Sequence, residues 1–206
     1  MCGRYSIQQV EQLPARYGVD QPTLPLDSNN NARPTQTLPI VAQDTTGVKH
    51  LEFMRWGLIP SWSKDMAIGS RLINARAETV AEKPSFRSSF KKMRCLIPAD
   101  GFYEWREEGS KKRPYCFTLK DKAIFSFAGL YSVWSDIEGN QLKTYTIITT
   151  TSNDLLQTYH NRMPVILLRE LEEVWLNAAD NDPSGLLTLL TPYDSKYMEV
   201  MQAHWL

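Results

Sequence analysis

The sequence predicts one domain built on an antiparallel β-meander that can close into a barrel, with short helices beside it. A single core is expected because the chain has 206 residues and 42% hydrophobic side chains. Five β-type segments lie between Arg94 and Thr151, and residues typical of turns separate the last four. Short links between consecutive strands favour antiparallel neighbours, so we expect a meander.

The first third of the chain predicts a short helix, a loop and a hairpin. Gln8–Tyr17 favours the helix, with Pro14 as an awkward interior residue and Gly18 as its stop. Pro, Asn and Thr dominate Gln21–Pro39, which predicts an ordered loop over a surface. A hairpin with its turn at Asp44–Gly47 follows. Its two strands are expected at Leu38–Gln43 and Val48–Trp56.

The next segment, Trp56–Trp62, is apolar but interrupted by Gly and Pro, so it predicts neither a regular strand nor a helix. Its two tryptophans form either a small core or a flat stacking platform. Further on, Phe86 and Phe90 stand four residues apart and predict a helix with one buried face. The cations around them form either a solvated helix face or a track for phosphates, and the sequence leaves both open.

One carboxylate stands out among the five β-type segments. These segments are Cys95–Pro98, Gly101–Trp105, Pro114–Leu119, Ile124–Trp134 and Leu142–Thr151. Alternation along the second puts Phe102 and Glu104 on one face, with Tyr103 and Trp105 on the other. Between large aromatic rings, Glu104 would lose hydration, which raises its pKa and makes it a candidate proton donor near pH 7. The alternative is a Glu on the solvated face of an edge strand.

The last quarter predicts a loop suited to chemistry and then mostly helices. Asn153–Tyr159 favours a short helix capped by Ser152 or Asn153, and it leads into His160–Pro164. A His and an Arg in a tight loop before a strand suit a functional site, although a lone His is usually structural. The remaining elements are a strand at Val165–Leu168, helices at Arg169–Ala178 (Leu171, Val174 and Trp175 on one face) and Ser184–Leu190, and a mildly helical tail at Tyr193–Leu206.

Charge is unevenly distributed although the net charge is zero. Residues 1–120 hold 18 Lys and Arg against 12 Asp and Glu, a balance of +6, and residues 121–206 hold 5 against 11, a balance of −6. Such asymmetry is typical of nucleic-acid-binding proteins, or of a basic and an acidic part that face each other in one fold.

Composition also excludes several classes of protein. No apolar run is long enough for a membrane span, and no basic-then-apolar signal peptide is present. Three cysteines at irregular spacing predict neither a disulfide framework nor a zinc site. We therefore expect a cytoplasmic or nuclear protein with reduced thiols, located at the nucleoid if it is bacterial. Nothing predicts an obligate interface, so we expect a monomer.

The N-terminus offers a reactive pair of groups. Because the second residue is small, removal of Met1 is expected, and the mature chain would begin at Cys2. Its α-amine and thiol, with ordinary pKa values of about 7.7–8.0 and about 8.5, would both be partly nucleophilic near neutral pH. Gly3 permits close approach of a substrate, and Arg4 supplies a cation for phosphate. The alternative is that Cys at position 2 is an accident.

Five motifs in this order resemble those of the SRAP (SOS-response-associated peptidase) family. They are Met1–Arg4, Arg55–Pro60, Ile73–Thr79, Cys95–Trp105 and His160–Pro164. The resemblance covers residues 2 to about 168 densely. It implies a single α+β domain over residues 1–206, built around a curved, barrel-like antiparallel sheet with flanking helices. It also implies binding to single-stranded DNA and a covalent crosslink to abasic sites through the N-terminal cysteine, which shields the lesion during the DNA damage response.

The resemblance also implies site residues. Cys2 looks like the nucleophile, surrounded by Asn74, Glu104 and His160 as the catalytic set. DNA contacts are expected from arginines, from residues that stack on or wedge against bases, and from neighbours in the same groove: Gly3, Arg4, Pro34, Trp62, Arg76, Thr149 and Arg162. Two departures are visible. Ser63 stands where some members have a second aromatic residue, which predicts a smaller stacking surface. The sequence ends at Leu206, where a further short segment would be expected.

The chemistry of an N-terminal cysteine agrees with this resemblance. The ring-opened abasic site carries an aldehyde, which a 1,2-aminothiol converts to an imine and then to a five-membered thiazolidine. Glu104 is the candidate proton shuttle, His160 would assist opening of the sugar or reversal of the link, and Asn74 would hold the Cys2 amine. No metal or cofactor is required. Affinity would come mainly from phosphates and fall as salt rises.

Two other functions remain open from the sequence. The first is an N-terminal-nucleophile thiol peptidase, acting at least on its own chain, in which Cys2 attacks an amide. The second is a non-covalent reader of modified or single-stranded DNA that uses the arginines and tryptophans without chemistry. A lyase-like activity on the abasic site is also compatible with these residues. The sequence does not show which DNA structure is preferred or whether the crosslink reverses.

Overall fold

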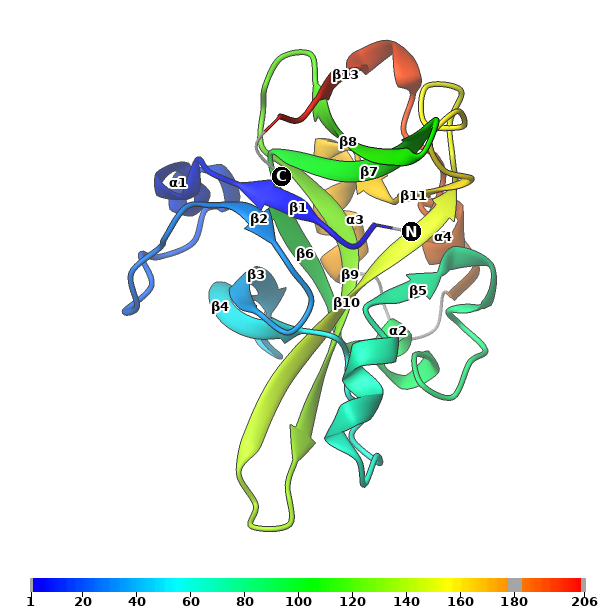
Figure 1. The fold of residues 1–206 in the computed structure, drawn as a ribbon. Helices are drawn as coiled ribbons and strands as arrows, with labels where there is room; N and C mark the ends of the chain where they lie inside the picture. The colour runs from blue at the N-terminus through cyan, green and yellow to red at the C-terminus, as the bar shows by residue number, and fades with distance from the viewer. Residues whose placement is uncertain (1, 178–182, 205–206) are drawn as a thin grey trace.

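Five strands close into a barrel at the centre of the molecule (Figure 1). The computed structural model describes residues 2–177 and 183–204. The barrel strands are β3 (Thr37–Gln43), β4 (Lys49–Trp56), β6 (Arg94–Ala99), β9 (Phe125–Ser135) and β10 (Gln141–Thr151). Their order is β10–β4–β3–β6–β9, and pairing of β9 with β10 closes the ring. All these pairs are antiparallel except β4 with β10, which is parallel.

The barrel interior is filled by aromatic side chains. Trp56 is completely buried and stacks on Tyr145, with ring centroids 6.2 Å apart. Tyr5, from a strand outside the barrel, packs on Trp56 with ring centroids 5.2 Å apart. Gly129 leaves room where β9 crosses β6, because a Cβ there would lie 2.6 Å from Ile97 Cδ1. One continuous core therefore extends from the barrel to the N-terminal strand.

A second sheet carries the N-terminus. Its order is β13 (Met198–Gln202), β8 (Lys111–Leu119), β7 (Gly101–Glu108), β1 (Tyr5–Ile7) and β2 (Asn29–Ala32). Strand β1 is thus held between β7 and β2, antiparallel to both. The expected single meander through residues 94–151 is wrong in this respect, since β7 and β8 leave the barrel and pair as a hairpin in the second sheet.

The change of sheet between β6 and β7 has a local cause. Asp100 separates the two strands, and its carboxylate accepts hydrogen bonds from Ser6 Oγ at 2.6 Å and from the backbone N–H of Gln8 at 2.5 Å. These contacts bind the junction to the N-terminal segment, so β7 continues beside β1 and does not fold back on β6. The hairpins β3–β4, β7–β8 and β9–β10 form as predicted.

Short helices and strands surround the two sheets. The α-helices are α1 (Leu13–Tyr17), α2 (Arg87–Lys92), α3 (Glu172–Asn177) and α4 (Pro183–Thr188). The 3-10 helices are η1 (Val10–Gln12), η2 (Met66–Arg71), η3 (Ala77–Thr79), η4 (Arg169–Leu171) and η5 (Ser195–Tyr197). The remaining strands are β5 (Asn74–Arg76), β11 (Arg162–Pro164) and β12 (Ile166–Leu167). None of the helices among the described residues is long and apolar enough to cross a membrane.

Helix details confirm some predictions and correct others. Gly18 ends α1 in the left-handed region (φ +63°), as expected, but Pro14 lies in the first turn, where the missing N–H costs little. Phe86 and Phe90 are buried at α2, as predicted. In α3, Val174 is exposed, so it does not share the buried face of Trp175. Ala178, the predicted end of that helix, lies outside the described residues.

Three further segments differ from expectation. The loop predicted over Gln21–Pro39 contains β2, because its asparagines pair with β1 through their backbones and not through their side chains. Asn153–Tyr159 forms turns and no regular helix, although Asn153 Oδ1 does accept from the Leu156 N–H as a cap. The tail, predicted to be helical, forms strand β13, since β8 offers it an open edge.

Ion pairs join the basic and the acidic portions of the chain. Arg16 binds the Glu172 carboxylate through both terminal nitrogens, at 2.9 and 2.7 Å, in a largely buried site. Lys49 pairs with Glu173, and Lys143 with Glu52. In the first two pairs a cation of residues 1–120 meets a carboxylate of residues 121–206, as expected if the two portions face each other, whereas Lys143–Glu52 has the opposite sense.

Candidate functional site around Cys2

The second sheet holds the first residues of the chain in a fixed position. Cys2 is completely buried, and the Arg4 carbonyl accepts a hydrogen bond from the Tyr103 N–H at 3.0 Å. In β1, Tyr5 is opposite Phe102, so continuing this register sets Gly3 opposite Glu104. In Figure 1 the segment that leads into β1 extends toward β10. The backbone thus places Cys2 next to the residue opposite Glu104, close enough for the charge of Glu104 to raise the pKa of the Cys2 thiol.

Asn74 binds the Cys2 backbone from the other side. Strand β5 runs parallel to β10, which fixes Asn74 opposite Ile147. From there its Nδ2 donates to the Cys2 carbonyl at 2.9 Å. The other amide atom, Oδ1, is buried and has no hydrogen-bond partner among the described residues. Asn74 therefore presents a buried acceptor beside the residue whose amine the sequence predicts to be reactive.

Glu104 is buried, as its aromatic surroundings predicted. It is 5% exposed, and burial is the main reason that its pKa is raised. Phe102, on the same face, stacks on Phe117 at 5.2 Å. Burial, and then the charge of Glu104, raise the pKa of the Cys2 thiol. The solvated edge-strand alternative for Glu104 is wrong, and its carboxyl group keeps a proton to higher pH than an exposed Glu does.

His160 is oriented by the backbone of its own loop. Its Nδ1 accepts from the Arg162 N–H at 2.9 Å, so the neutral ring carries its proton on Nε2. Burial lowers the pKa of His160, which favours this neutral form. The neighbouring Tyr159 packs on Phe117 of β8, with ring centroids 5.1 Å apart. The loop thus bridges the barrel end of β10 and the sheet that carries Glu104.

Of the predicted phosphate-binding arginines, Arg4 and Arg76 lie near the N-terminal strand. The Arg4 guanidinium donates to Asn31 Oδ1 at 2.7 Å and lies 5.6 Å over the Trp105 ring. Partial burial and then the charge of Arg33 lower the pKa of Arg4, so these two cations are neighbours. Arg76 ends β5 and is exposed. Arg33 was missed by the sequence analysis, although its place beside Pro34 was a signal.

Arg162 is already engaged by a carboxylate. Its terminal nitrogens bind both oxygens of Glu78, one of them at 3.0 Å, and its side chain is 13% exposed. Hydrogen bonding to Arg162 lowers the pKa of Glu78. Thr149 is completely buried, and its carbonyl accepts from Arg162. A phosphate contact from Arg162 would compete with Glu78, and Thr149 would act through Arg162.

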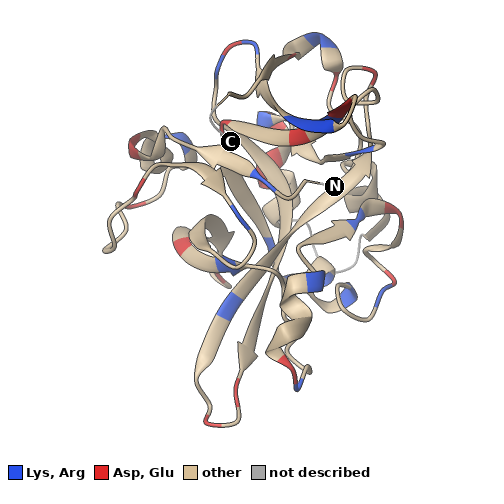
Figure 2. Cartoon of the chain, in the orientation of Figure 1, with Lys and Arg blue, Asp and Glu red and all other residues tan. Residues whose placement is uncertain are grey.

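The two tryptophans of the apolar segment differ in burial. Trp56 is core, whereas Trp62 is 61% exposed. Pro34 is half-buried in a turn where Thr35 has φ +75°. The turn is tied to the same strand end, since the Thr35 N–H donates to the Trp56 carbonyl at 2.9 Å. Figure 2 shows Lys and Arg on β1 and beyond β4, and acidic residues at the tip of the β9–β10 hairpin.

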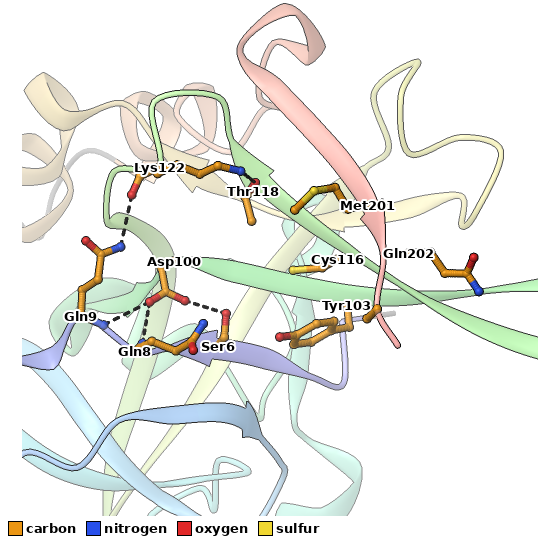
Figure 3. Close-up of a pocket in the computed structure, with 11 residues that line it drawn as sticks. Ser6, Gln8, Gln9, Asp100, Tyr103, Cys116, Thr118, Lys122, Met201 and Gln202 are labelled. Carbon is orange, nitrogen blue, oxygen red and sulfur yellow. Dashed lines mark hydrogen bonds between the residues drawn. The ribbon is translucent and has the colours of Figure 1, made fainter. Parts of the chain in front are cut away.

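A pocket of about 380 Å³ lies on the opposite face of β7 and is separate from this site (Figure 3). Tyr103, Cys116 and Asp100 line it, and alternation along β7 directs Glu104 away from it. Burial raises the pKa of Cys116 to about 11, so this thiol is a poor nucleophile. The described residues contain no group of three His, Cys, Asp or Glu side chains that could hold a metal ion.

A family model described as SOS response associated peptidase (SRAP) matches residues 1–204. Abasic site processing protein YoqW of Bacillus subtilis is similar to this chain, with 45% identity over 206 residues, 98% of this chain and 92% of the relative. Abasic site processing protein YMR114C of Saccharomyces cerevisiae is 34% identical over 193 residues, 89% of this chain and 51% of the relative.

A solved structure has the same fold. The crystal structure of a protein from Bacteroides thetaiotaomicron superposes with a TM-score of 0.89 at 34% identity, over 99% of this chain and 93% of that one. The crystal structure of a protein from Bordetella bronchiseptica superposes with a TM-score of 0.85 at 26% identity, over 98% of this chain and 99% of that one. The barrel and the second sheet are therefore shared over nearly the whole length of all three proteins.

Proposed function

The chain belongs to the SOS response associated peptidase family, and from this premise we propose that it processes abasic sites in single-stranded DNA by forming a covalent crosslink through Cys2. Curated relatives such as YoqW are named abasic site processing proteins, which supports the class of lesion. In this proposal Met1 is removed, and the freed amine and thiol of Cys2 react with the aldehyde of the ring-opened sugar.

The observation that carries the proposal is the position of Cys2 between Asn74 and Glu104. Asn74 Nδ2 fixes the Cys2 carbonyl at 2.9 Å, and the neighbouring strand sets a buried carboxyl group beside it. The unpartnered Asn74 Oδ1 is a suitable acceptor for the amine of a mature N-terminus. Such a built environment around a chain end suits a reactive terminus.

The amine acts first in the proposed reaction. Burial disfavours the thiolate of Cys2, so the amine attacks the aldehyde carbon, and loss of one water gives an imine. The thiol sulfur then adds to the imine carbon, and the thiol proton moves to the nitrogen, which closes a thiazolidine ring. Because both nucleophiles belong to one residue, ring closure is intramolecular and gains a large effective molarity.

Glu104 and His160 supply the proton transfers. A protonated Glu104 can give its proton to the departing hydroxyl of the carbinolamine, and its raised pKa keeps it protonated at higher pH than an ordinary Glu. His160, neutral with its proton on Nε2, can donate a hydrogen bond to the sugar oxygen while the ring opens. Reversal of the crosslink would use the same groups in the opposite direction.

Single-stranded DNA fits the surface around this site better than a duplex. Arg4, Arg33 and Arg76 supply phosphate contacts, and the exposed Trp62 offers a face on which an unpaired base can stack. If three phosphates are neutralised, the logarithm of the affinity should fall with the logarithm of salt with a slope of about −2, at about 0.7 for each contact.

The thiol peptidase alternative is less well supported. Attack on an amide requires the thiolate, and both burial and the charge of Glu104 oppose its formation at Cys2. A non-covalent reader would need the arginines and Trp62 but neither Glu104 nor the Asn74 contact. Neither alternative accounts for the buried carboxyl group beside the chain terminus.

The test is a crosslinking assay with untagged protein and a single-stranded oligonucleotide that carries one abasic site. The proposal predicts a band that survives denaturation, with an intact mass one water below the sum of protein and DNA. Cys2→Ala should abolish this band while it keeps non-covalent binding. An oligonucleotide with a tetrahydrofuran abasic analogue, which cannot open to an aldehyde, is the matched substrate control. An adduct of equal yield with Cys2→Ala would refute the proposal.

A further inference from the structure

Trp134 stands at the end of the β9–β10 hairpin, far from Cys2, and binds the loop that presents Trp62. It is the second-last residue of β9, paired with Leu142 of β10. Its indole Nε1 donates to the Ser63 carbonyl at 2.7 Å, although the two residues are 71 positions apart in sequence. In Figure 1 the segment that follows β4 lies beside this hairpin. The contact attaches the loop to the hairpin at residue 63, in addition to the bonds that its first half makes with β10.

The loop of residues 57–65 is held firmly at its first half. The Gly57 N–H donates to the Tyr145 carbonyl at 2.8 Å, and the Ile59 N–H donates to Thr144 Oγ1 at 2.9 Å. Gly57 also approaches η2 closely, because a Cβ there would lie 2.6 Å from the Gly69 carbonyl oxygen, and its φ of +119° favours glycine. Residues 57–60 are buried as a result.

The second half of the loop depends on Trp134. The Ser63 N–H closes a turn on the Pro60 carbonyl at 2.9 Å, and Ser63 Oγ donates to the Asp65 carbonyl at 3.0 Å. These bonds shape the turn, but the Trp134 indole is what connects it to the hairpin. Trp62 lies between the two anchored parts with 61% of its surface exposed. A ring on a fixed backbone loses little entropy when it binds a partner.

The chemistry around Trp62 suits single-stranded nucleic acid. Lys64 precedes η2 and Arg71 is its last residue; both are exposed, and Figure 2 shows cations at the tip of the loop and again at the end of η2. The loop's one carboxylate, Asp65, accepts from the Ala67 N–H at 2.8 Å and caps η2. An aromatic face with flanking cations is the combination that binds bases by stacking and phosphates by charge.

We propose that Trp134 is a positioning residue for DNA binding: through its hydrogen bond to Ser63 it holds Trp62 as a stacking platform for an unpaired base. The inference rests on the proposed function, because it concerns the same DNA strand. It assigns a role to a residue outside the Cys2 site and to the hairpin that carries it. Ser63 has no ring to add to the platform, so its contribution is the backbone carbonyl that Trp134 uses.

The test measures non-covalent binding in the Cys2→Ala background by fluorescence anisotropy, with a labelled abasic single strand at several salt concentrations. Trp62→Ala should weaken binding by about 5- to 100-fold, the loss expected for one stacked base. Trp134→Phe keeps an aromatic ring but removes the N–H, and should weaken binding by about 2- to 10-fold. Neither change should alter the salt dependence, because no phosphate contact is lost.

The double variant separates positioning from direct contact. If Trp134 acts through Trp62, adding Trp134→Phe to Trp62→Ala should cause no further loss of affinity. Hydrogen–deuterium exchange of residues 60–65 should also become faster in Trp134→Phe while the barrel strands keep their protection. Trp175→Phe is the matched control, because it removes another indole hydrogen bond, to the Cys95 carbonyl at 3.0 Å, far from the loop. It should lower stability and leave DNA affinity unchanged.

Several outcomes would overturn the inference. They are parental affinity in Trp134→Phe, fully additive losses in the double variant, or a changed salt slope. The crosslinking gel on the wild-type protein tests the proposed function separately. A wild-type adduct together with parental binding by Trp134→Phe would refute the role of Trp134 alone, whereas absence of any adduct would refute the function that the inference rests on.

Discussion

Removal of the Asn74 side chain should slow crosslinking without unfolding the protein. Asn74→Ala deletes the 2.9 Å hydrogen bond to the Cys2 carbonyl and leaves that carbonyl buried without its partner. An unsatisfied buried acceptor costs about 1–3 kcal/mol. If that cost destabilises the reactive position of Cys2, the crosslinking rate should drop by about 5- to 150-fold, since about 1.4 kcal/mol corresponds to a factor of ten.

Asn74→Asp should have a larger effect that depends on pH. A carboxylate cannot donate to the Cys2 carbonyl, and it places a negative charge close to the buried Glu104 carboxyl group. Once protonated it can donate again, so part of the activity should return as pH falls. In Asn74→Ala no such recovery is expected.

Both variants are measured by single-turnover crosslinking to an abasic oligonucleotide, quantified on a denaturing gel, with thermal unfolding as a check on folding. Asn177→Ala is the control, because it removes an exposed amide contact to Glu173 at 3.1 Å. The reasoning is refuted if folded Asn74→Ala crosslinks at the wild-type rate, or if Asn74→Asp is as active as wild type at all pH values.

Two further predictions concern buried carboxylates. Burial raises the pKa of Glu104, so folded protein keeps this proton to higher pH than the unfolded chain, and the stability it contributes is lost as pH rises through the raised pKa. The melting temperature of Glu104→Gln should therefore lie above that of wild type at about pH 8 and equal it at about pH 4, and the variant should crosslink more slowly. Melting curves that match wild type at both pH values would contradict this. Glu172→Gln breaks the buried ion pair with Arg16 and should lower the free energy of unfolding in urea by about 3–5 kcal/mol. The folded variant should crosslink at the wild-type rate. A slower rate would link this ion pair to the Cys2 site.

Local sequence signals predicted much of the fold. Turn residues between β-type segments identified the three hairpins, because a short link leaves two strands little choice but to pair. The change of sheet at Asp100 could not be predicted, since its hydrogen-bond partners lie 92 and 94 residues earlier. Strand β13 was missed for the same reason, because its pairing with β8 is decided by an open sheet edge and not by its own residues.

The candidate site was predictable where chemistry is local. Glu104 could be identified from the rings on either side of it, and its burial confirms the expected desolvation. The pairing of Arg162 with Glu78 joins residues 84 positions apart and has no sequence signal. The same holds for the indole of Trp134 on Ser63. The role of a residue that acts through one long-range hydrogen bond can be recognised only once the three-dimensional positions of the strands are known.

The position of β1 between β7 and β2 has a consequence for biosynthesis. Tyr5 pairs with Ala32 of β2 and with Phe102 of β7, so the ribosome must release about a hundred residues before the first strand can be held between both neighbours. At about 5–20 residues per second this takes several seconds. During that time the nascent N-terminus is accessible to an aminopeptidase, whereas in the folded chain the Cys2 side chain is completely buried. We therefore expect removal of Met1, if it occurs as proposed, to take place during translation.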